Sequence, residues 1–182
     1  MQNIYIALLR GINVSGQKKI KMADLKIHFE ALGYDHVQTY IQSGNVIFST
    51  QATDQKILAE QISDQLKSTY GFDVPVLVKT LEELTDIIQN NPFTEERYHQ
   101  DQQIYFTLLG EPPHLENLQK LEDISYPNEA YHIDGTTIYF FCSQGYGRAK
   151  MNNNFFENKL KVTATTRNWK TVNKLIALAA ES

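Results

Sequence analysis

The chain has 182 residues, of which 42% are hydrophobic and 21% are charged, and these values are those of a globular protein rather than a disordered one. Its longest apolar runs, at 4–9 and 175–180, are far shorter than the roughly 18 residues that a membrane span needs, and no basic residue precedes the first run as in a secretory signal. The single cysteine, Cys142, excludes an internal disulfide and agrees with a reducing compartment. We therefore expect a cytoplasmic protein with no membrane partner.

Charge is distributed unevenly along the chain. Residues 1–30 carry a net charge of +3, residues 31–144 carry −12, and residues 145–182 carry +5, which together give the overall −4. Two basic ends in an acidic protein suggest that the end segments share a surface that meets an anionic partner.

Alternation and turn signals predict that the first half of the chain is βαββαβ with one further helix. In chain order we expect a strand at 5–10, a helix at 22–32, a strand at 36–41, a Ser43-Gly44 turn, a strand at 45–50, a helix from an Asp54 cap to Gly71, a strand at 74–79, and a helix from a Thr80/Glu83 capping box to Asn91-Pro92.

The second half repeats the first. Tyr5 and Leu9 recur 100 positions later as Tyr105 and Leu109, and the hairpin around Gly44 recurs 91 positions later at an Asp134-Gly135 turn. The spacing from the first strand to the second is nine residues longer in the first copy, and we place the extra residues at 11–21.

This pattern predicts an α+β protein with two ferredoxin-like βαββαβ repeats, each an antiparallel sheet with helices and an added C-terminal helix. We assign the repeats to residues 1–91 and 102–182, with a polar linker at 92–101.

Three basic segments are candidates for binding an anion. The first, residues 10–21, joins a strand to a helix, where backbone N–H groups and lysines can hold phosphate. It is not a Walker A loop, because its lysine comes one residue late and Lys19 stands where a magnesium-binding Ser or Thr is required. The alternative interpretation is a solvated basic loop.

The second basic segment presents Arg148 and Lys150 from a mobile loop rich in glycine and asparagine, and the alternative is a plain connection. The third is 165–169, where Asn168 is the expected cap of the last helix and Arg167 offers a planar fork to an anion.

We expect the first and third strands of each repeat to run parallel. The loop after Arg10 then lies at the opposite end of its sheet from the Ser43-Gly44 turn and from Thr80, and Arg148 lies at the opposite end from Arg167. A single site made from all three segments would depend on how the two repeats dock.

No catalytic constellation is recognisable. In the predicted second hairpin His132 pairs with Thr137, roughly 17 Å along the sheet from Cys142, which is too far for a nucleophile and its base. The other histidines and the acidic pairs lack the spacing for metal ligation or for acid/base catalysis. We predict no catalytic residue, metal or cofactor, and leave open whether the protein is an enzyme.

Aromatic residues on the first and third strands leave open the stacking of RNA bases on the sheet. They are Tyr5, Phe48, Tyr105, Tyr139 and Phe141. The segment 43–48 lacks the basic-Gly-aromatic start of an RNA recognition motif, and the alternative is that these rings are core residues under an added helix.

Four motifs in this order resemble the bacterial domain of unknown function 1697 (DUF1697) family: ALLRGINVSG at 7–16, KIKMADL at 19–25, YIQSGNV at 40–46 and TTRNW at 165–169. The resemblance covers nearly the whole chain and implies a paired ferredoxin-like fold but no activity. It implies that six residues belong to the family pattern: Arg10, Asn13, Gln42, Asn45, Arg167 and Asn168. Residues 151–154 have no close counterpart in the pattern.

The leading hypothesis is a protein that binds a phosphorylated small molecule or a nucleic acid, with a monomer favoured over an oligomer. The candidate ligand-binding residues are Arg10, Asn13, Lys18, Lys19, Lys21, Gln42, Asn45, Arg167 and Asn168. The alternatives are an enzyme with its site in the cleft between the repeats, and an interaction module for an acidic protein.

Overall fold

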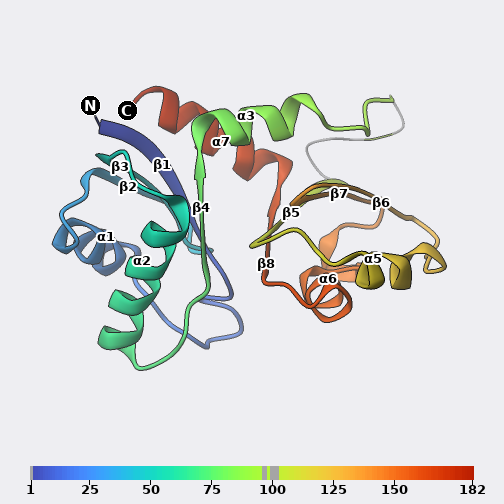
Figure 1. Ribbon diagram of the computed structural model, residues 1–182, viewed down its shortest axis with the longest axis horizontal. Helices are drawn as coiled ribbons and strands as arrows, with labels where there is room; N and C mark the ends of the chain where they lie inside the picture. The colour runs from blue at the N-terminus through green and yellow to red at the C-terminus, as the bar shows by residue number, and fades with distance from the viewer. Residues whose placement is uncertain (1, 96–97, 99–102) are drawn as a thin grey trace. The chain divides into compact units, whose positions relative to one another are not determined.

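The computed structural model describes residues 2–95, 98 and 103–182. The first half contains β1 (Gln2–Leu9), α1 (Met22–Ala31), β2 (Asp35–Tyr40), β3 (Asn45–Gln51), α2 (Gln55–Tyr70), β4 (Val76–Thr80) and α3 (Leu81–Gln89). The second half contains β5 (Ile104–Leu109), α5 (Leu115–Glu122), β6 (Glu129–Asp134), β7 (Thr137–Cys142), the short 3-10 helix η1 (Tyr146–Arg148), α6 (Asn153–Leu160), β8 (Ala164–Asn168) and α7 (Trp169–Ala180) (Figure 1). The predicted order of elements is confirmed in both halves.

The chain forms two compact units. The first consists of Met1–Asp86 together with Lys174–Ser182, and the second of Ile87–Asn173. The last part of α7 therefore belongs to the first unit. Half of the predicted linker at 92–101 lies outside the described residues.

Each unit contains a four-stranded antiparallel sheet, with strand order β2-β3-β1-β4 in the first and β6-β7-β5-β8 in the second. This order is ferredoxin-like and confirms the predicted fold class. The expectation that the first and third strands run parallel is wrong, because β1 pairs antiparallel with β3 and places Leu8 opposite Asn45. The helical crossover makes β1 and β2 parallel, and the hairpin then turns β3 back between them.

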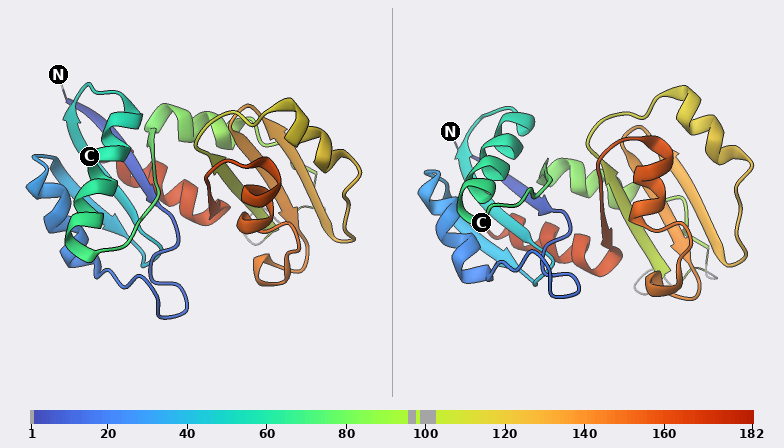
Figure 2. Two further views of the ribbon diagram at one scale, coloured as in Figure 1. Left: turned by 60° about the horizontal axis from the view of Figure 1, so that its bottom comes forward. Right: turned by 90° about the horizontal axis from the view of Figure 1, so that it is seen from below.

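The helices α1 and α2 cover one face of the first sheet (Figures 1 and 2). Phe48 lies at the centre of this core, with ring centroids 5.8 Å from Tyr5, 5.4 Å from Phe29 and 4.6 Å from Tyr34. Leu58, Ile62 and Leu66 complete it from α2. Tyr5 and Phe48 are therefore core residues and do not form an open platform for RNA bases.

The opposite face of this sheet is covered as well. Ile6, Leu8 and Ile47 have no exposed surface although they point away from α1 and α2. Leu175 and Leu178 from the C-terminal segment of this unit are also buried. This segment, the red end of the chain in Figure 2, gives the first sheet its second apolar layer.

The second unit packs α5 and α6 against one face of its sheet around Phe140 and Phe156. Tyr139 is buried on the other face, and Phe141 is covered by Phe93 and Tyr98. The hydroxyl of Tyr105 accepts a hydrogen bond from the N–H of Tyr146. None of these strand aromatics forms an open base-stacking surface in the described part of the chain.

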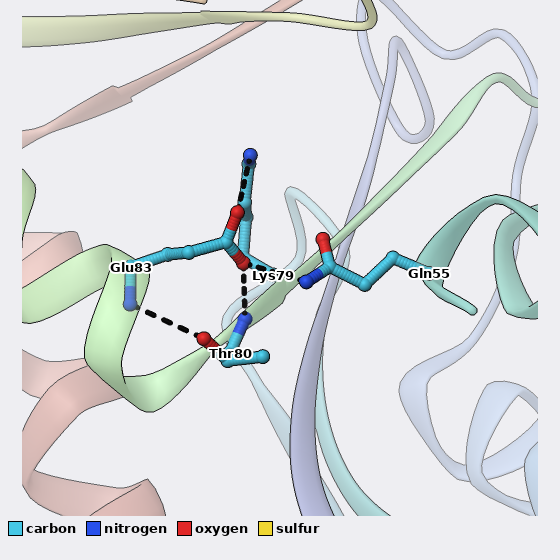
Figure 3. Close-up of polar contacts among 4 residues, drawn as sticks. All are labelled: Gln55, Lys79, Thr80 and Glu83. Carbon is cyan, nitrogen blue, oxygen red and sulfur yellow. Dashed lines mark hydrogen bonds and ion pairs between the residues drawn. The ribbon is translucent and has the colours of Figure 1, made fainter. Parts of the chain in front are cut away.

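The predicted helix ends of the first unit are confirmed. The Asp54 carboxylate accepts a hydrogen bond from the N–H of Lys56 at 2.8 Å, and Gly71 ends α2 in the left-handed conformation. At the start of α3 the Glu83 carboxylate accepts the N–H of Thr80, and the Thr80 hydroxyl accepts the N–H of Glu83 (Figure 3). This reciprocal pair satisfies backbone donors that the first helical turn leaves unpaired.

The Glu83 carboxylate also accepts hydrogen bonds from Gln55 at 2.9 Å and Lys79 at 3.0 Å. Burial alone raises the pKa of Glu83, but the hydrogen bond from Thr80 and the hydrogen bond and charge of Lys79 together lower it below its ordinary value of 4.5. A carboxyl whose pKa is lower in the folded chain stabilises the fold above its unfolded pKa, and this contribution is lost as the pH falls through the folded value.

We expect Glu83→Gln to lower the free energy of unfolding by about 0.5 kcal/mol at pH 7, because it removes the partly exposed ion pair with Lys79. The difference from the wild type should shrink as the pH falls below 4.5. Urea denaturation across this range measures it, with Glu82→Gln in the same helical turn as the control. A difference that stays constant with pH would contradict the assignment.

Candidate functional site

The connection from β1 to α1 departs in length from its counterpart in the second unit. It runs over residues 10–21, whereas the equivalent connection from β5 to α5 runs only over 110–114. Most of the extra length predicted for the first copy is therefore here. In Figure 1 it is the blue loop below the first sheet, and it carries Arg10, Lys18, Lys19 and Lys21.

Asn13 organises this loop through its side-chain amide. Its nitrogen donates to the carbonyl oxygens of Ile20 and Gln42, both at 2.9 Å, and its oxygen accepts the N–H of Ile20 at 2.9 Å. The residue has a positive φ of 56°, which asparagine adopts more readily than most residues. Asn13 thus closes the loop on itself and ties it to the turn between β2 and β3.

That turn, residues 41–44, lies directly beside the loop. The N–H of Leu9 donates to the carbonyl of Gly44 at 2.8 Å. Asn45 has no exposed surface, and its amide nitrogen donates to the carbonyl of Tyr40 and the hydroxyl of Ser43. The prediction that the Ser43-Gly44 turn lies at the opposite end of the sheet from the loop is therefore wrong, because β3 starts where β1 ends.

Thr80, in contrast, pairs with Tyr5 and lies toward the other end of the sheet from the loop, as expected.

The four cations of the loop have different surroundings. The ammonium group of Lys18 donates to the carbonyl of Asp73 at 2.6 Å and lies 5.9 Å from the ring centroid of Phe72, so it fastens the loop to the segment before β4. Lys19 and Lys21 are exposed, and Arg10 is partly buried. Gln42, whose backbone carbonyl accepts the hydrogen bond from Asn13, is also exposed. The loop and the turn together form what we call the loop end of the first unit, residues 10–21 and 41–45.

The loop end leads directly into α1. Lys21 occupies the N-cap position and its side chain makes no capping hydrogen bond, while Asp24 is the acidic residue of the first turn. The positive end of a helix dipole disfavours nearby cations by about 0.3 to 1 kcal/mol each. Lys19 and Lys21 are therefore placed where a bound anion would improve the local electrostatics.

The remaining predicted site residues belong to the second unit. Arg167 is 8% exposed, and its guanidinium donates to the carbonyl of Thr166 at 2.9 Å. Asn168 caps α7 as predicted, because its oxygen accepts the N–H of Thr171 at 2.8 Å. The structure thus brings Arg10, Asn13, Lys18, Lys19, Lys21, Gln42 and Asn45 together in the first unit and places Arg167 and Asn168 in the second.

The expectation that Arg148 and Arg167 occupy opposite ends of the second sheet is wrong. β7 and β8 both pair antiparallel with β5, so both strands finish at the end of the sheet where β5 begins. The loop that carries Arg148 is ordered by Glu129, whose carboxylate accepts the N–H groups of Lys150 at 2.7 Å and Met151 at 2.8 Å.

Asn152 and Asn153, in the run of three asparagines after this loop, make hydrogen bonds that order the backbone. Asn152 caps α6 by accepting the N–H of Phe155, and the Asn153 amide donates to the carbonyl of Ala164 and accepts the hydroxyl of Thr166. The sequence indicated a polar loop here but not these bonds.

Cys142 does not have the surroundings of a nucleophile. The pairing predicted for His132 is wrong by two residues, because the hairpin turns at Gly135-Thr136 and His132 pairs with Tyr139, while Cys142 pairs with Glu129. The thiol is 1% exposed and donates to the carbonyl of Gly145, and burial raises its pKa. A thiol with a raised pKa is largely protonated and weakly reactive at neutral pH.

Within residues 2–95, 98 and 103–182, no three histidine, cysteine, aspartate or glutamate side chains are grouped as metal ligands would be. No helix in this part of the chain is long and apolar enough to cross a membrane.

The fold and the loop end define a protein of two ferredoxin-like units, the first of which carries an extended basic loop. The chain belongs to the family described as protein of unknown function (DUF1697), whose model matches residues 1–139. The matched region includes the motifs of the loop end and stops before the motif at 165–169.

Among solved structures, the chain is similar to the conserved bacterial protein SP0830 from Streptococcus pneumoniae. The two share 22% sequence identity with a TM-score of 0.77 over 98% of this chain and 99% of the other, which is evidence for the common fold. No curated protein matches the chain.

Proposed function

We propose that the loop end of the first unit binds a phosphate-bearing ligand in the cytoplasm, either a phosphorylated small molecule or a nucleic acid. One observation carries this proposal. Asn13 joins the loop to a turn that is distant in sequence, and the joined surface exposes Lys19 and Lys21 at the positive end of α1.

Asp73, the acidic residue that Lys18 contacts, already has a lysine partner. Asp73 forms an ion pair with Lys67 at 2.9 Å, and the hydrogen bond and charge of Lys67 hold the pKa of this carboxyl below its ordinary value. Its charge is thus matched mainly by Lys67, and Lys18, which donates to the Asp73 carbonyl, adds a weaker electrostatic attraction. Lys19 and Lys21 are left to attract an anion.

The geometry supports recognition of phosphate oxygens rather than of a particular base. Two flexible ammonium groups and the first N–H groups of α1 can donate to the oxygens of one phosphate. Gln42, exposed beside them, can add a neutral hydrogen bond. Such contacts give affinity with little sequence preference.

The proposal is tested by following backbone amide signals during titration with inorganic phosphate, ATP and a ten-nucleotide single strand, at two salt concentrations. We expect shifts at 11–24 and 41–45. For a single strand that contacts three phosphates, the logarithm of the affinity should fall with the logarithm of the salt concentration with a slope of about −2. If all three probes leave these amides unshifted, the proposal fails.

We expect the double variant Lys19→Gln/Lys21→Gln to bind its best probe at least about tenfold more weakly, since it loses two charge-assisted contacts. It should unfold at the same or a slightly higher urea concentration, because it removes cations from the positive end of α1. The matched control is Lys56→Gln/Lys120→Gln, which changes the net charge equally at exposed positions elsewhere. An equal loss of affinity in the control would mean that only overall charge matters.

An acidic protein is the second candidate partner. Val14 and Ile41 at the loop end are 58% and 46% exposed, and they give the cations apolar neighbours. A partner that combines acidic and apolar side chains would use both kinds of contact, whereas a free phosphate would use only the cations. Substituting Val14 and Ile41 with serine weakens binding in the first case and leaves it unchanged in the second.

A further inference from the structure

The first unit has a concave surface at the end of the sheet away from the loop end. It is a depression of about 400 Å³ bordered by the start of β1, the end of β3, the connection from α1 to β2, and α2. Gln2 pairs with Gln51 at this end, whereas Leu8 pairs with Asn45 at the other. The two surfaces are therefore separated by the length of the sheet.

The depression has a rigid base. Tyr34 and Leu58 line it and are 6% and 1% exposed. The Tyr34 ring is stacked on Phe48 with a centroid distance of 4.6 Å, and its hydroxyl donates to the side-chain oxygen of Gln61 at 3.0 Å. Burial raises the pKa of this hydroxyl, so it remains a hydrogen-bond donor at neutral pH. A ligand would meet a preformed surface rather than mobile side chains.

The rim combines donors and acceptors. The amide nitrogen of Gln2 reaches across β3 to the Asp35 carboxylate at 2.6 Å, which fixes both side chains. Gln51, Gln61, Thr50 and Thr53 add further carboxamides and hydroxyls. Carboxamides and hydroxyls can both donate and accept. The Thr53 hydroxyl already donates to the carbonyl of Gln51 at 2.8 Å, so it is left as an acceptor. Gln61 accepts the bond from Tyr34 with its side-chain oxygen. Within the described part of the chain, its amide nitrogen donates no side-chain hydrogen bond.

The charge of the lining restricts the ligand. No lysine, arginine or histidine is among the described residues that line the depression, and its single acid, Asp35, already accepts from Gln2. An anion would meet no cation, and a polyamine would meet only one carboxylate. The hydroxyl groups of a ligand, in contrast, can both donate hydrogen bonds to carboxamides and hydroxyls and accept hydrogen bonds from them. The volume falls within the range of about 300 to 1,000 Å³ that is usual for small-molecule sites.

We propose that this depression binds a neutral, hydroxyl-rich small molecule of the size of a monosaccharide. This site is independent of the anion site proposed above, because it shares none of its residues and selects for the absence of charge.

The test is a titration of the full chain with glucose, galactose, mannose and ribose, followed by backbone amide signals, with spermidine and inorganic phosphate as charged probes. At least one sugar is expected to shift the amides of 33–35 and 50–53 in a saturable way. The charged probes should leave these amides in place. The proposal is overturned if no sugar does so, or if a charged probe occupies the depression instead.

Thr50→Val tests the chemistry without changing the shape. It removes one hydroxyl from the rim, and we expect about fivefold weaker binding of the best sugar, as for the loss of one neutral hydrogen bond. Thr69→Val, at an exposed position of α2, is the matched control and should bind normally.

Gln61→Leu is a second variant that is expected to lose binding, with Gln65→Leu one turn later as its control. Unchanged affinity in both Thr50→Val and Gln61→Leu would overturn the assignment.

Discussion

Replacing Gly44 with alanine is expected to lower the free energy of unfolding by about 2 to 4 kcal/mol. Two effects add. Gly44 has a φ of +83°, where an L residue is strained, and an added Cβ would lie 2.6 Å from Cδ1 of Ile12 and 2.8 Å from Cβ of Leu9. The Ile12 side chain is buried and Leu9 is held in β1, so neither has room to move away.

Urea denaturation of the full chain measures this loss. Gly71→Ala is the matched control, because Gly71 has a similar φ of +75° but no atom within 4 Å of the added Cβ. It should cost only the backbone strain, about 1 kcal/mol. Since the loop end is built on the contact of Gly44 with Ile12, the amides of 11–21 should also shift in Gly44→Ala. Equal costs for the two alanine variants would show that Ile12 and Leu9 give way.

The isosteric change Asn13→Asp is expected to cost about 2 to 3 kcal/mol at pH 7. The amide nitrogen of Asn13 donates to two carbonyl oxygens, of Ile20 and Gln42. A carboxylate in its place would direct a negative oxygen at both carbonyls and lose both donors. The loop would separate from the turn, and affinity for the phosphate-bearing ligand should fall with the stability.

This cost has a characteristic pH dependence. An aspartate at position 13 is disfavoured as the anion, so its pKa in the folded chain should be higher than in the unfolded chain. Its protonated form can donate to one carbonyl, so the penalty should be smallest below the unfolded pKa of about 3.9 and should grow as the pH rises through the folded value. Asn3→Asp, at an exposed position of β1, is the control. A penalty that is equal at low and neutral pH would contradict the role given to Asn13.

Local signals predicted the elements well. Asp54 and Gly71 mark the ends of α2, and Thr80 and Glu83 form the expected capping box, because each of these signals acts within one helical turn. The internal repeat predicted two units of the same topology, since matching apolar positions in both halves restrict the fold more strongly than one periodic segment does.

Strand direction and register were predicted poorly because they depend on pairs that are distant in sequence. The antiparallel pairing of β1 with β3 follows from the ferredoxin-like topology, yet we expected a parallel pair and so separated the loop from the turn. In the second hairpin, placing the turn one residue too early changed the partner of His132 from Tyr139 to Thr137.

The composition of the candidate site was predictable, but the roles of its residues were not. The motifs at 7–16 and 40–46 meet at the loop end. Within it, however, the amides of Asn13 and Asn45 hold the backbone in place, and Lys18 is bound to the carbonyl of Asp73. A sequence motif does not distinguish a residue that shapes a loop from one that touches a ligand, because both roles require a particular polar side chain.

The membership of Lys174–Ser182 in the first unit has a consequence for biosynthesis. Ile6, Leu8 and Ile47 are made early, but Lys174–Ser182, which belongs to their unit, is made only after the whole second unit. At the usual rate of translation, this apolar face waits on the order of ten seconds for its permanent cover. During that interval the exposed apolar face of the nascent first half can be bound by chaperones, and the first unit is completed only after the whole second unit has been synthesised.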